Sequence, residues 1–207
     1  MPTLSLRFVI AGLFMCWCGL ARAELACSPE AVHPLEIGAK APVFSLTSAD
    51  GSVKNLAAIF SAKPTVLIFY RGGWCPYCNR HLAMLAELEL PLRTLGFQIV
   101  AVSPDPVEKL VETHGRQHLR YQLLSDKDML ATPAYGLAYC ISAENGKGFL
   151  ENGIQLPPVP GSTNFWLPVP AAFIIDRGGV VRFVFSNADP EIRVSEAALL
   201  AAAKSVR

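Results

Sequence analysis

The segment that decides the fold is residues 65–78, with the sequence TVLIFYRGGWCPYC. Its first six residues are an unbroken β-branched and aromatic run, which is typical of a central strand buried on both faces. The turn that follows holds two glycines, and Pro76 suits the first position of a helix. The segment therefore predicts a buried strand that passes through a tight turn into a helix starting beside Cys75.

From Lys40 onward, short β-rich runs alternate with helical stretches, which indicates an α/β domain. A short hairpin is expected around the turn Asp50-Gly51, and an antiparallel hairpin around residues 177–179. Further strands are expected over residues 97–103, 171–176 and 180–186. Helices are expected over residues 76–90, 106–114 and 128–135 and in the alanine-rich end from residue 190. Pro91 should interrupt or kink the first of these helices.

Residues 141–168 break this alternation. They hold four prolines, four glycines and only three charged residues. Four apolar side chains can dock on the rest of the domain: Phe149, Ile154, Phe165 and Trp166. We therefore expect an ordered, irregular insertion within a single domain that covers residues 40–207.

The strongest chemical signal is the motif Cys75-Pro-Tyr-Cys78. If Pro76 is the first helical residue, Cys75 is the N-cap, and free backbone N–H groups and the positive end of the helix dipole point at its sulfur. A thiolate is stabilised there, so the pKa of Cys75 is expected below that of a free thiol. Cys78, Leu82 and Leu85 share the core-facing stripe of the helix. Cys75 is therefore expected to attack and Cys78 to resolve, through a small reducible disulfide ring.

The side chains around the pair allow a functional and a structural interpretation. Trp74 can form an aromatic wall beside the sulfur, or be an ordinary packed ring next to the turn glycines 72 and 73. Arg71 can supply a cation that activates a thiol, or be a solvated charge at the end of the strand. His81, one turn past Cys78, can tune the pair or be an ordinary surface histidine, and the surface position is expected.

Five stretches resemble a known family: residues 41–46 (APVFSL), 69–78 (FYRGGWCPYC), 99–105 (IVAVSPD), 135–136 (YG) and 168–176 (PVPAAFIID). Together they are similar to the peroxiredoxin-like branch of the alkyl hydroperoxide reductase and thiol-specific antioxidant (AhpC/TSA) family, in the thioredoxin-fold superfamily. The resemblance implies a thioredoxin-like α/β fold, with a central mixed β-sheet flanked by helices, an N-terminal β-hairpin and thiol redox chemistry.

Two catalytic elements of that family are replaced in this sequence. The family's Pro-x-x-x-Thr-x-x-Cys segment places its peroxidatic cysteine at Cys78, its threonine at Cys75 and its proline at Arg71. The arginine that the family holds before a late strand falls at Pro170, where thioredoxins have a cis-proline that faces the disulfide. Both departures favour dithiol–disulfide exchange over peroxide chemistry.

The first 23 residues are typical of a secretory signal peptide. A basic residue precedes an apolar run at 8–20, which is too short to cross a bilayer of about 30 Å, and Ala21 and Ala23 suit cleavage before Glu24. An uncleaved membrane anchor is the alternative. After cleavage, an N-terminal arm at 24–39 precedes the domain. We expect a periplasmic product without stable membrane insertion.

Four cysteines remain in the exported chain, which enters an oxidising compartment. Cys27 and Cys140 are expected to form a second disulfide that pins the N-terminal arm. The alternative is that Cys140 acts as a distant resolving thiol. A purely structural disulfide between Cys75 and Cys78 is a further alternative for the motif.

Composition and spacing argue against several other functions. The formal net charge is +1 and there is no basic stripe, so nucleic-acid binding lacks its electrostatic footprint. No second Cys-x-x-Cys completes a zinc site, and Asn79 stands where haem attachment needs a histidine. His114 and His118 have no carboxylate pair beside them. We therefore expect no metal and no cofactor.

The expected function is that of an exported thiol oxidoreductase. Reduced Cys75 attacks a disulfide in a protein or small molecule, Cys78 releases the product, and an upstream thiol reductant reopens the bridge. Direct reduction of hydroperoxides by the same pair is the alternative within the enzyme class. A non-catalytic redox sensor, in which the pair switches docking of residues 141–168, is the alternative outside it.

Overall fold

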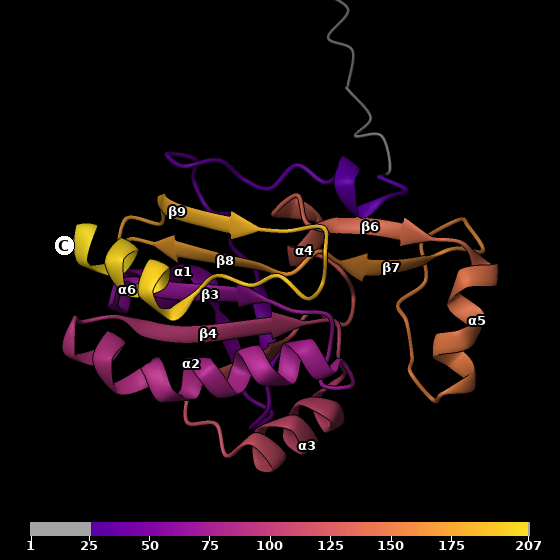
Figure 1. The fold of residues 1–207 in the computed structure, drawn as a ribbon, viewed down its shortest axis with the longest axis horizontal. Helices are drawn as coiled ribbons and strands as arrows, with labels where there is room; N and C mark the ends of the chain where they lie inside the picture. Colours follow the sequence, from indigo (N-terminus) through magenta and orange to yellow (C-terminus); the bar gives the residue numbers. More distant parts are fainter. Residues whose placement is uncertain (1–25, 207) are drawn as a thin grey trace, which may run out of the picture.

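The computed structural model describes residues 26–206, which form a seven-stranded mixed β-sheet with helices on both faces (Figure 1). The strand order is β2-β1-β5-β4-β3-β8-β9. The strands of this sheet are β1 (Ser45–Ser48), β2 (Val53–Asn55), β3 (Thr65–Phe69), β4 (Gln98–Ser103), β5 (Gln122–Ser125), β8 (Ala171–Ile175) and β9 (Val181–Ser186). A separate antiparallel ribbon pairs β6 (Ala138–Ile141) with β7 (Phe165–Pro168). The expected central mixed sheet flanked by helices is confirmed.

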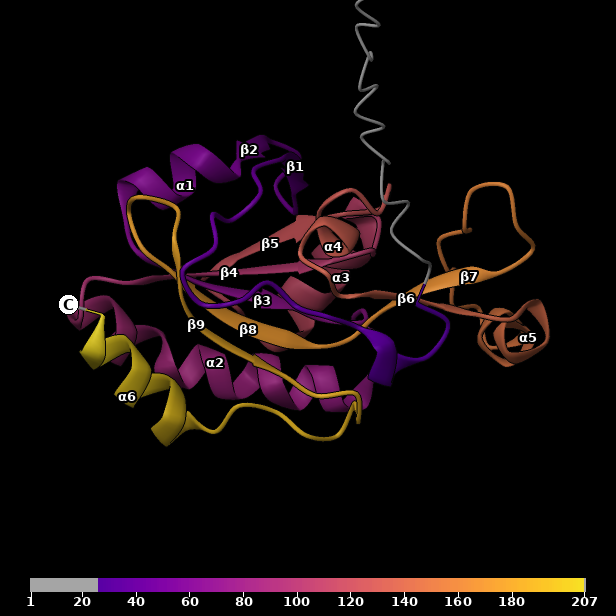
Figure 2. The ribbon, with the colours of Figure 1, turned by 90° about the horizontal axis from the view of Figure 1, so that it is seen from above.

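The helices divide between the two faces of the sheet. Helices α2 (Pro76–Thr94), α3 (Val107–Gln117) and α6 (Glu196–Ser205) contribute to one apolar core, and α1 (Leu56–Ala62) and α4 (Ala131–Ala134) to the other. Figure 2 shows α2 and α6 on the side of the sheet opposite to α1. The turn η1 (Pro29–Ala31) lies in the N-terminal arm, and α5 (Ala143–Glu151) lies at one end of the molecule.

β3 lies at the centre of the sheet, parallel to β4 and antiparallel to β8. Val66 and Ile68 belong to the core under α2, whereas Leu67 and Phe69 belong to the core on the opposite face. Burial on both faces explains why the strand is apolar at every position. The chain leaves β3 at Tyr70 and enters the loop that carries both motif cysteines.

The other expected strands, 97–103, 171–176 and 180–186, are confirmed as β4, β8 and β9, with ends that differ by one residue. Two helices are shorter than expected. α4 occupies only four residues, because Met129 has φ 50° and this left-handed conformation interrupts any helix before it. α6 begins only after Ser195, whose hydroxyl accepts a hydrogen bond from the Ala198 N–H.

Helix α2 runs past Pro91 and ends at Thr94, so the expectation that Pro91 interrupts it is wrong. Leu88 and Leu92 are buried against the sheet on either side of the proline, and Pro91 itself faces solvent. Burial of these leucines outweighs the hydrogen bond that the proline lacks. Gly96, with φ 91°, follows the end of the helix in the left-handed conformation that is typical of a glycine at this position.

The insertion at residues 141–168 is irregular over 152–164, as expected, but the rest of it holds more regular structure than expected. It contains α5 and β7, and β7 pairs with β6 in register from Ala138–Pro168 to Ile141–Phe165. The Ser142 hydroxyl caps α5 by accepting the Asn145 N–H. A Cβ at Gly146 would lie 2.5 Å from the Phe165 ring, so this glycine lets the helix pack closely on β7.

The N-terminal arm is tied to the domain at several points. A disulfide joins Cys27 to Cys140, with 4.7 Å between their Cα atoms, and the Cys140 N–H donates to the Ala26 carbonyl. Further along the arm, the Leu35 N–H donates to the Tyr135 carbonyl. The signal peptide expected at 1–23 lies outside the described residues. Within residues 26–206, no helix has the length and apolar character needed to span a membrane.

Candidate active site

Cys75 occupies the N-cap position of α2, with Pro76 as the first helical residue. The pKa of Cys75 is lowered to about 6, chiefly by a hydrogen bond from the Cys78 thiol. Backbone N–H groups of Cys78 and Tyr77 and the positive charge of Arg71 add to this effect, while burial opposes it. Cys75 is therefore a thiolate at neutral pH.

Cys78 has the opposite character. Its pKa is raised because its thiol donates a hydrogen bond to Cys75 and because it is fully buried. Leu82 and Leu85, on the same helix stripe, are fully buried as well. The two sulfurs thus form a thiolate and a protonated partner in contact, an asymmetry that favours Cys75 as the nucleophile.

Both sulfurs lie beneath the molecular surface. The exposed fraction of Cys75 is only 2% and that of Cys78 is zero. Any substrate must displace part of this cover to reach Cys75, and a disulfide in a folded protein partner must displace more of it than a small molecule. The low exposure of Cys75 therefore favours a small substrate over a folded protein partner.

Two aromatic rings pack with a guanidinium group at the loop that leads to Cys75. Arg71 lies over the Trp74 ring, with 5.2 Å from its Cζ to the ring centroid, and over the Phe149 ring at 5.9 Å. The two rings meet edge to face with their centroids 5.4 Å apart. Arg71 is half-buried, so it is not a fully solvated strand-end charge. Phe149 comes from α5, so the insertion contacts the loop beside the thiols.

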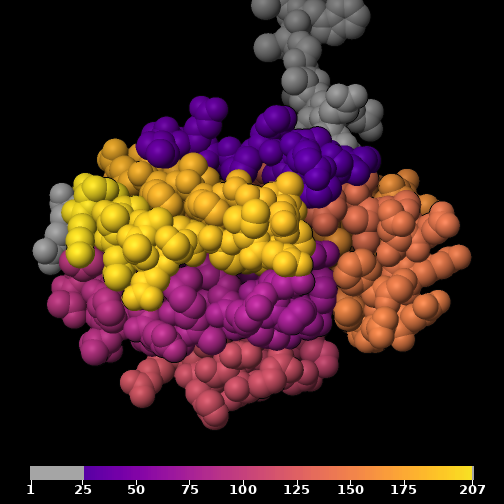
Figure 3. Space-filling model, viewed as in Figure 1, coloured from indigo at the N-terminus to yellow at the C-terminus, as the bar shows by residue number. Residues whose placement is uncertain are grey.

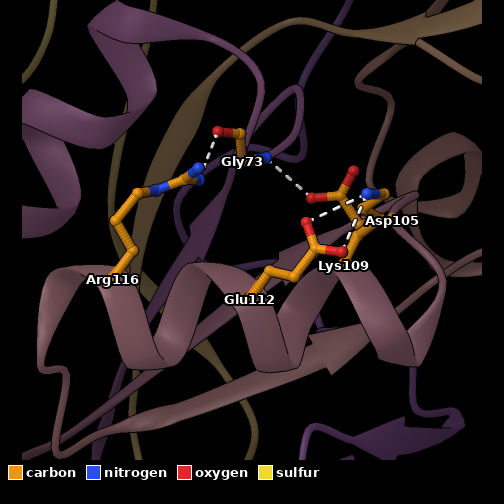
Figure 4. Close-up of polar contacts among 5 residues, drawn as sticks. All are labelled: Gly73, Asp105, Lys109, Glu112 and Arg116. Atoms are coloured by element: carbon orange, nitrogen blue, oxygen red, sulfur yellow. Dashed lines mark hydrogen bonds and ion pairs between the residues drawn. The ribbon is translucent and has the colours of Figure 1, made fainter. Parts of the chain in front are cut away.

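Helix α3 and the residues before it hold the loop in place (Figure 4). Asp105 accepts a hydrogen bond from the Gly73 N–H at 2.7 Å, and Arg116 donates to the Gly73 carbonyl at 2.9 Å. Asn79 donates to the same carbonyl at 2.9 Å. Burial raises the pKa of the Asp105 carboxyl. The sequence assigned no role to Asp105 or Arg116, although Asp105 ends one of the stretches that resemble the family.

The turn glycines are structural requirements of this loop. Gly72 has φ 146°, which few other residues adopt. A Cβ at Gly73 would lie 1.9 Å from the Thr113 hydroxyl oxygen, so only glycine allows the loop to approach α3 this closely. A cavity of about 290 Å³ opens beside this contact, between Trp74, α3 and residues 152–155.

A second cation lies against Cys78. Arg193, in the segment between β9 and α6, places its Nη2 atom 3.7 Å from the Cys78 sulfur. Figure 3 shows the C-terminal segment, in yellow, lying along α2, in magenta.

His81 is buried with 6% of its surface exposed, so the expectation of a surface histidine is wrong. Burial and the nearby Arg193 lower the pKa of His81 to about 4.

Comparison with known proteins settles the family. Residues 37–184 match the AhpC/TSA family. The chain belongs to the AhpC/TSA family. Peroxiredoxin Bcp of Escherichia coli (strain K12) is 30% identical over 156 residues, which cover 75% of this chain and 88% of that protein. The crystal structure of peroxidoxin BcpB from Mycobacterium tuberculosis superposes with a TM-score of 0.65 at 21% identity, covering 84% of this chain and 99% of the other.

A relative of the peroxiredoxin type from Mycobacterium tuberculosis is 33% identical over 99 residues, which cover 48% of this chain. The chain matches only 62% of that relative's length. The expected thioredoxin-like fold agrees with the peroxidoxin BcpB structure, and the expectation of a thiol-dependent enzyme agrees with these relatives.

Pro170, where the AhpC/TSA resemblance places an arginine, does not adopt the expected cis bond. Every peptide bond between residues 26 and 206 is trans. The Val169 N–H donates to the Leu137 carbonyl, which continues the pairing of the β6–β7 ribbon and carries an extended chain directly into β8. The trans form is also the intrinsically preferred one before proline. Within the same residues, no three His, Cys, Asp or Glu side chains gather into a metal-binding group.

Proposed function

We propose that this protein is a two-cysteine thiol peroxidase that reduces hydroperoxides. The observation that carries the proposal is the covered thiolate: Cys75 has a pKa of about 6 and only 2% exposure, in contact with the protonated Cys78. A small hydroperoxide suits such a site better than a folded partner. Among the proteins to which the chain is similar are peroxiredoxins, which supports the same choice.

The reaction consumes one hydroperoxide for each reduced pair. The Cys75 thiolate attacks the terminal oxygen of the hydroperoxide, the O–O bond breaks, and the departing alkoxide takes up a proton and leaves as an alcohol. Cys75 becomes a sulfenic acid. The Cys78 sulfur then displaces the sulfenic oxygen, which leaves as water, and a Cys75–Cys78 disulfide forms. An external dithiol reductant restores both thiols by exchange.

Dithiol–disulfide exchange with an outside substrate is the second candidate. It is favoured by Arg71 and Cys75, which stand where the family has the proline and threonine of its peroxide-binding segment. The motif Cys75-Pro-Tyr-Cys78 at a helix N-terminus also suits exchange. Because Cys75 is buried, such activity needs the chain around the sulfur to move.

Single-turnover measurements on the reduced protein separate the two candidates. We expect the wild type to consume one equivalent of hydrogen peroxide and to form the Cys75–Cys78 disulfide. Cys78→Ser should also consume one equivalent but stop at a sulfenic acid that dimedone traps, and Cys75→Ser should consume none. Faster reduction of a small disulfide than of hydrogen peroxide would instead support the exchange enzyme.

Export to the periplasm is part of the proposal. It is supported by the signal-like residues 1–23 and by the disulfide between Cys27 and Cys140, because disulfides persist in oxidising compartments. Sequencing the N-terminus of the protein recovered from the periplasm tests it: the mature chain should begin at Glu24.

A further inference from the structure

The segment between β9 and α6 brings a guanidinium group to the second thiol. Arg193 Nη2 donates to the Cys78 sulfur across 3.7 Å, and Nη1 donates to the Ile192 carbonyl. The Nε atom is buried and has no hydrogen-bond partner among the described residues. No carboxylate within residues 26–206 forms an ion pair with Arg193. Its charge is therefore available to the sulfur.

The fold fixes the position of this cation. The Tyr77 hydroxyl, on the first turn of α2, donates to the Glu191 carboxylate. The Asp189 carboxylate accepts the Glu191 N–H at 2.8 Å, and Val194 is buried in the core under α2. The chain is thus fixed at Glu191, before Arg193, and at Val194, after it. The backbone therefore holds the guanidinium beside Cys78.

The other groups that face Cys78 leave Arg193 as the positive charge in contact with its sulfur. Tyr70, directly after β3, is neutral because burial raises the pKa of its hydroxyl. His81, on α2, is neutral because its pKa is lowered to about 4. From the loop, Arg71 contributes a backbone N–H to Cys78, while its guanidinium acts on Cys75. The negative charge that faces Cys78 is the Cys75 thiolate.

We propose that Arg193 activates Cys78 for the second half of the reaction, an inference that rests on the proposed two-cysteine chemistry. While Cys75 is a thiolate, its charge keeps Cys78 protonated. Once Cys75 has become a neutral sulfenic acid or a mixed disulfide, that repulsion is gone and Arg193 remains. Cys78 then loses its proton more easily and attacks Cys75.

The atoms balance at each step. In the sulfenic acid, the new S–S bond replaces the S–O bond, and the released hydroxide takes the Cys78 proton and leaves as water. When a reductant thiolate later attacks Cys75, the S–S bond breaks and Cys78 leaves as a thiolate beside Arg193. Arg193 lies beyond residues 37–184, the part of the chain that matches the family, so it comes from a different place in the fold than the arginine replaced by Pro170.

A two-step exchange with 2,2′-dithiodipyridine tests the proposal without any hydroperoxide. Attack by Cys75 on the reagent releases one 2-thiopyridone, and attack by Cys78 on the resulting mixed disulfide releases a second. The Cys78→Ser variant identifies the first release because it cannot give the second. The two rates are followed against pH by stopped-flow absorbance in the wild type, Arg193→Met, Arg193→Lys and the control Arg120→Met, which alters an exposed arginine on the loop before β5.

In Arg193→Met, we expect the first release to stay within about twofold of the wild type and the second to slow by about tenfold or more, with its pH profile shifted to higher pH. Arg193→Lys should recover much of the second rate, and Arg120→Met should match the wild type. An unchanged second release in Arg193→Met overturns the proposal. So does equal slowing of both releases without recovery by lysine, which would indicate a structural role. If hydrogen peroxide is not consumed but the two releases still separate, the peroxidase assignment fails and the role of Arg193 stands.

Discussion

At the scale of single residues, two identical side chains acquire opposite properties from their surroundings. Cys75 lies at the N-cap, where backbone N–H groups and Arg71 favour its thiolate, and Cys78 lies one turn inside the helix, where burial favours its thiol. The hydrogen bond between them increases the difference. One additional cation acts on each sulfur, Arg71 on Cys75 and Arg193 on Cys78.

The burial of His81 can be tested through the pH dependence of the free energy of unfolding. Its pKa is about 4 in the folded chain and about 6.5 when unperturbed, so between these values the unfolded chain binds a proton that the folded chain does not. Stability therefore falls as the pH drops from about 6.5 towards 4, by about 3 kcal/mol from this residue, and His81 has no effect above that window.

Urea unfolding of the wild type and His81→Leu between about pH 4 and pH 7 measures this contribution. The free energy of unfolding of the variant should depend less steeply on pH over that range. His33→Leu, which alters an exposed histidine, should keep the wild-type slope. Parallel curves for the wild type and His81→Leu would contradict the buried neutral imidazole.

At the scale of elements, α3 acts as a support for the loop before Cys75. Gly73→Ala would bring a Cβ to 1.9 Å from the Thr113 hydroxyl and 3.1 Å from its Cβ. We expect a loss of about 1 to 3 kcal/mol in stability, together with slower alkylation of Cys75, because the loop or the helix must move. Adding Thr113→Ala should recover much of both losses.

Gly115→Ala, on the same helix, is the matched control. A Cβ there meets nothing within 4 Å, so this change should be neutral or stabilise the helix by about 0.5 to 1 kcal/mol. Thermal unfolding and the alkylation rate report on both variants. A Gly73→Ala protein as stable and as reactive as the wild type would show that the contact with α3 does not position the loop.

The local sequence pattern was sufficient to predict some helices and strands and insufficient for others. β3 and the start of α2 were predictable because an apolar run and an N1 proline act within a few residues. α5 was missed because its two glycines weaken helix propensity, and its stability depends on the Ser142 cap and on packing against Phe165. The path of α2 past Pro91 depends likewise on burial of its leucines, which the local sequence does not reveal.

The candidate site shows the same division. The cysteine pair and its position at a helix N-terminus followed from spacing alone. Asp105 and Arg193 were not found, and Phe149 was expected only to dock on the domain, because each reaches the loop or the sulfurs from an element distant in the sequence. Arg193 and Cys78 are separated by 115 residues, and no short motif joins them. His81 is also close enough to Arg193 to feel its charge, which the local sequence does not reveal.

At the scale of the whole molecule, the N-terminal arm and the β6–β7 ribbon are joined by the disulfide between Cys27 and Cys140, which spans 113 residues of chain. Closing a loop of this length restricts the unfolded chain and stabilises the fold by about 4 to 5 kcal/mol in the chain-entropy model. The ribbon leads into α5, whose Phe149 covers the loop beside Cys75. The disulfide, the β6–β7 ribbon and α5 with its Phe149 therefore follow one another as parts of one structure.

Removing this disulfide should separate stability from chemistry. Replacing both Cys27 and Cys140 by alanine is expected to lower the free energy of unfolding by several kcal/mol, measured in urea with the Cys75–Cys78 pair kept reduced in both proteins. Single-turnover consumption of hydrogen peroxide should remain close to that of the wild type. Equal stability of the two proteins would contradict a stabilising role, and loss of turnover would make the pair part of the reaction.

The central claim is that Cys75 is ionised at neutral pH in the folded, reduced protein. The direct measurement is the rate of iodoacetamide alkylation at Cys75 against pH, with the modified cysteine identified by peptide mass spectrometry. The account predicts a midpoint near pH 6 for Cys75 and little reaction at Cys78 over the same range. A midpoint near 9.0, the ordinary value for a thiol, would contradict it.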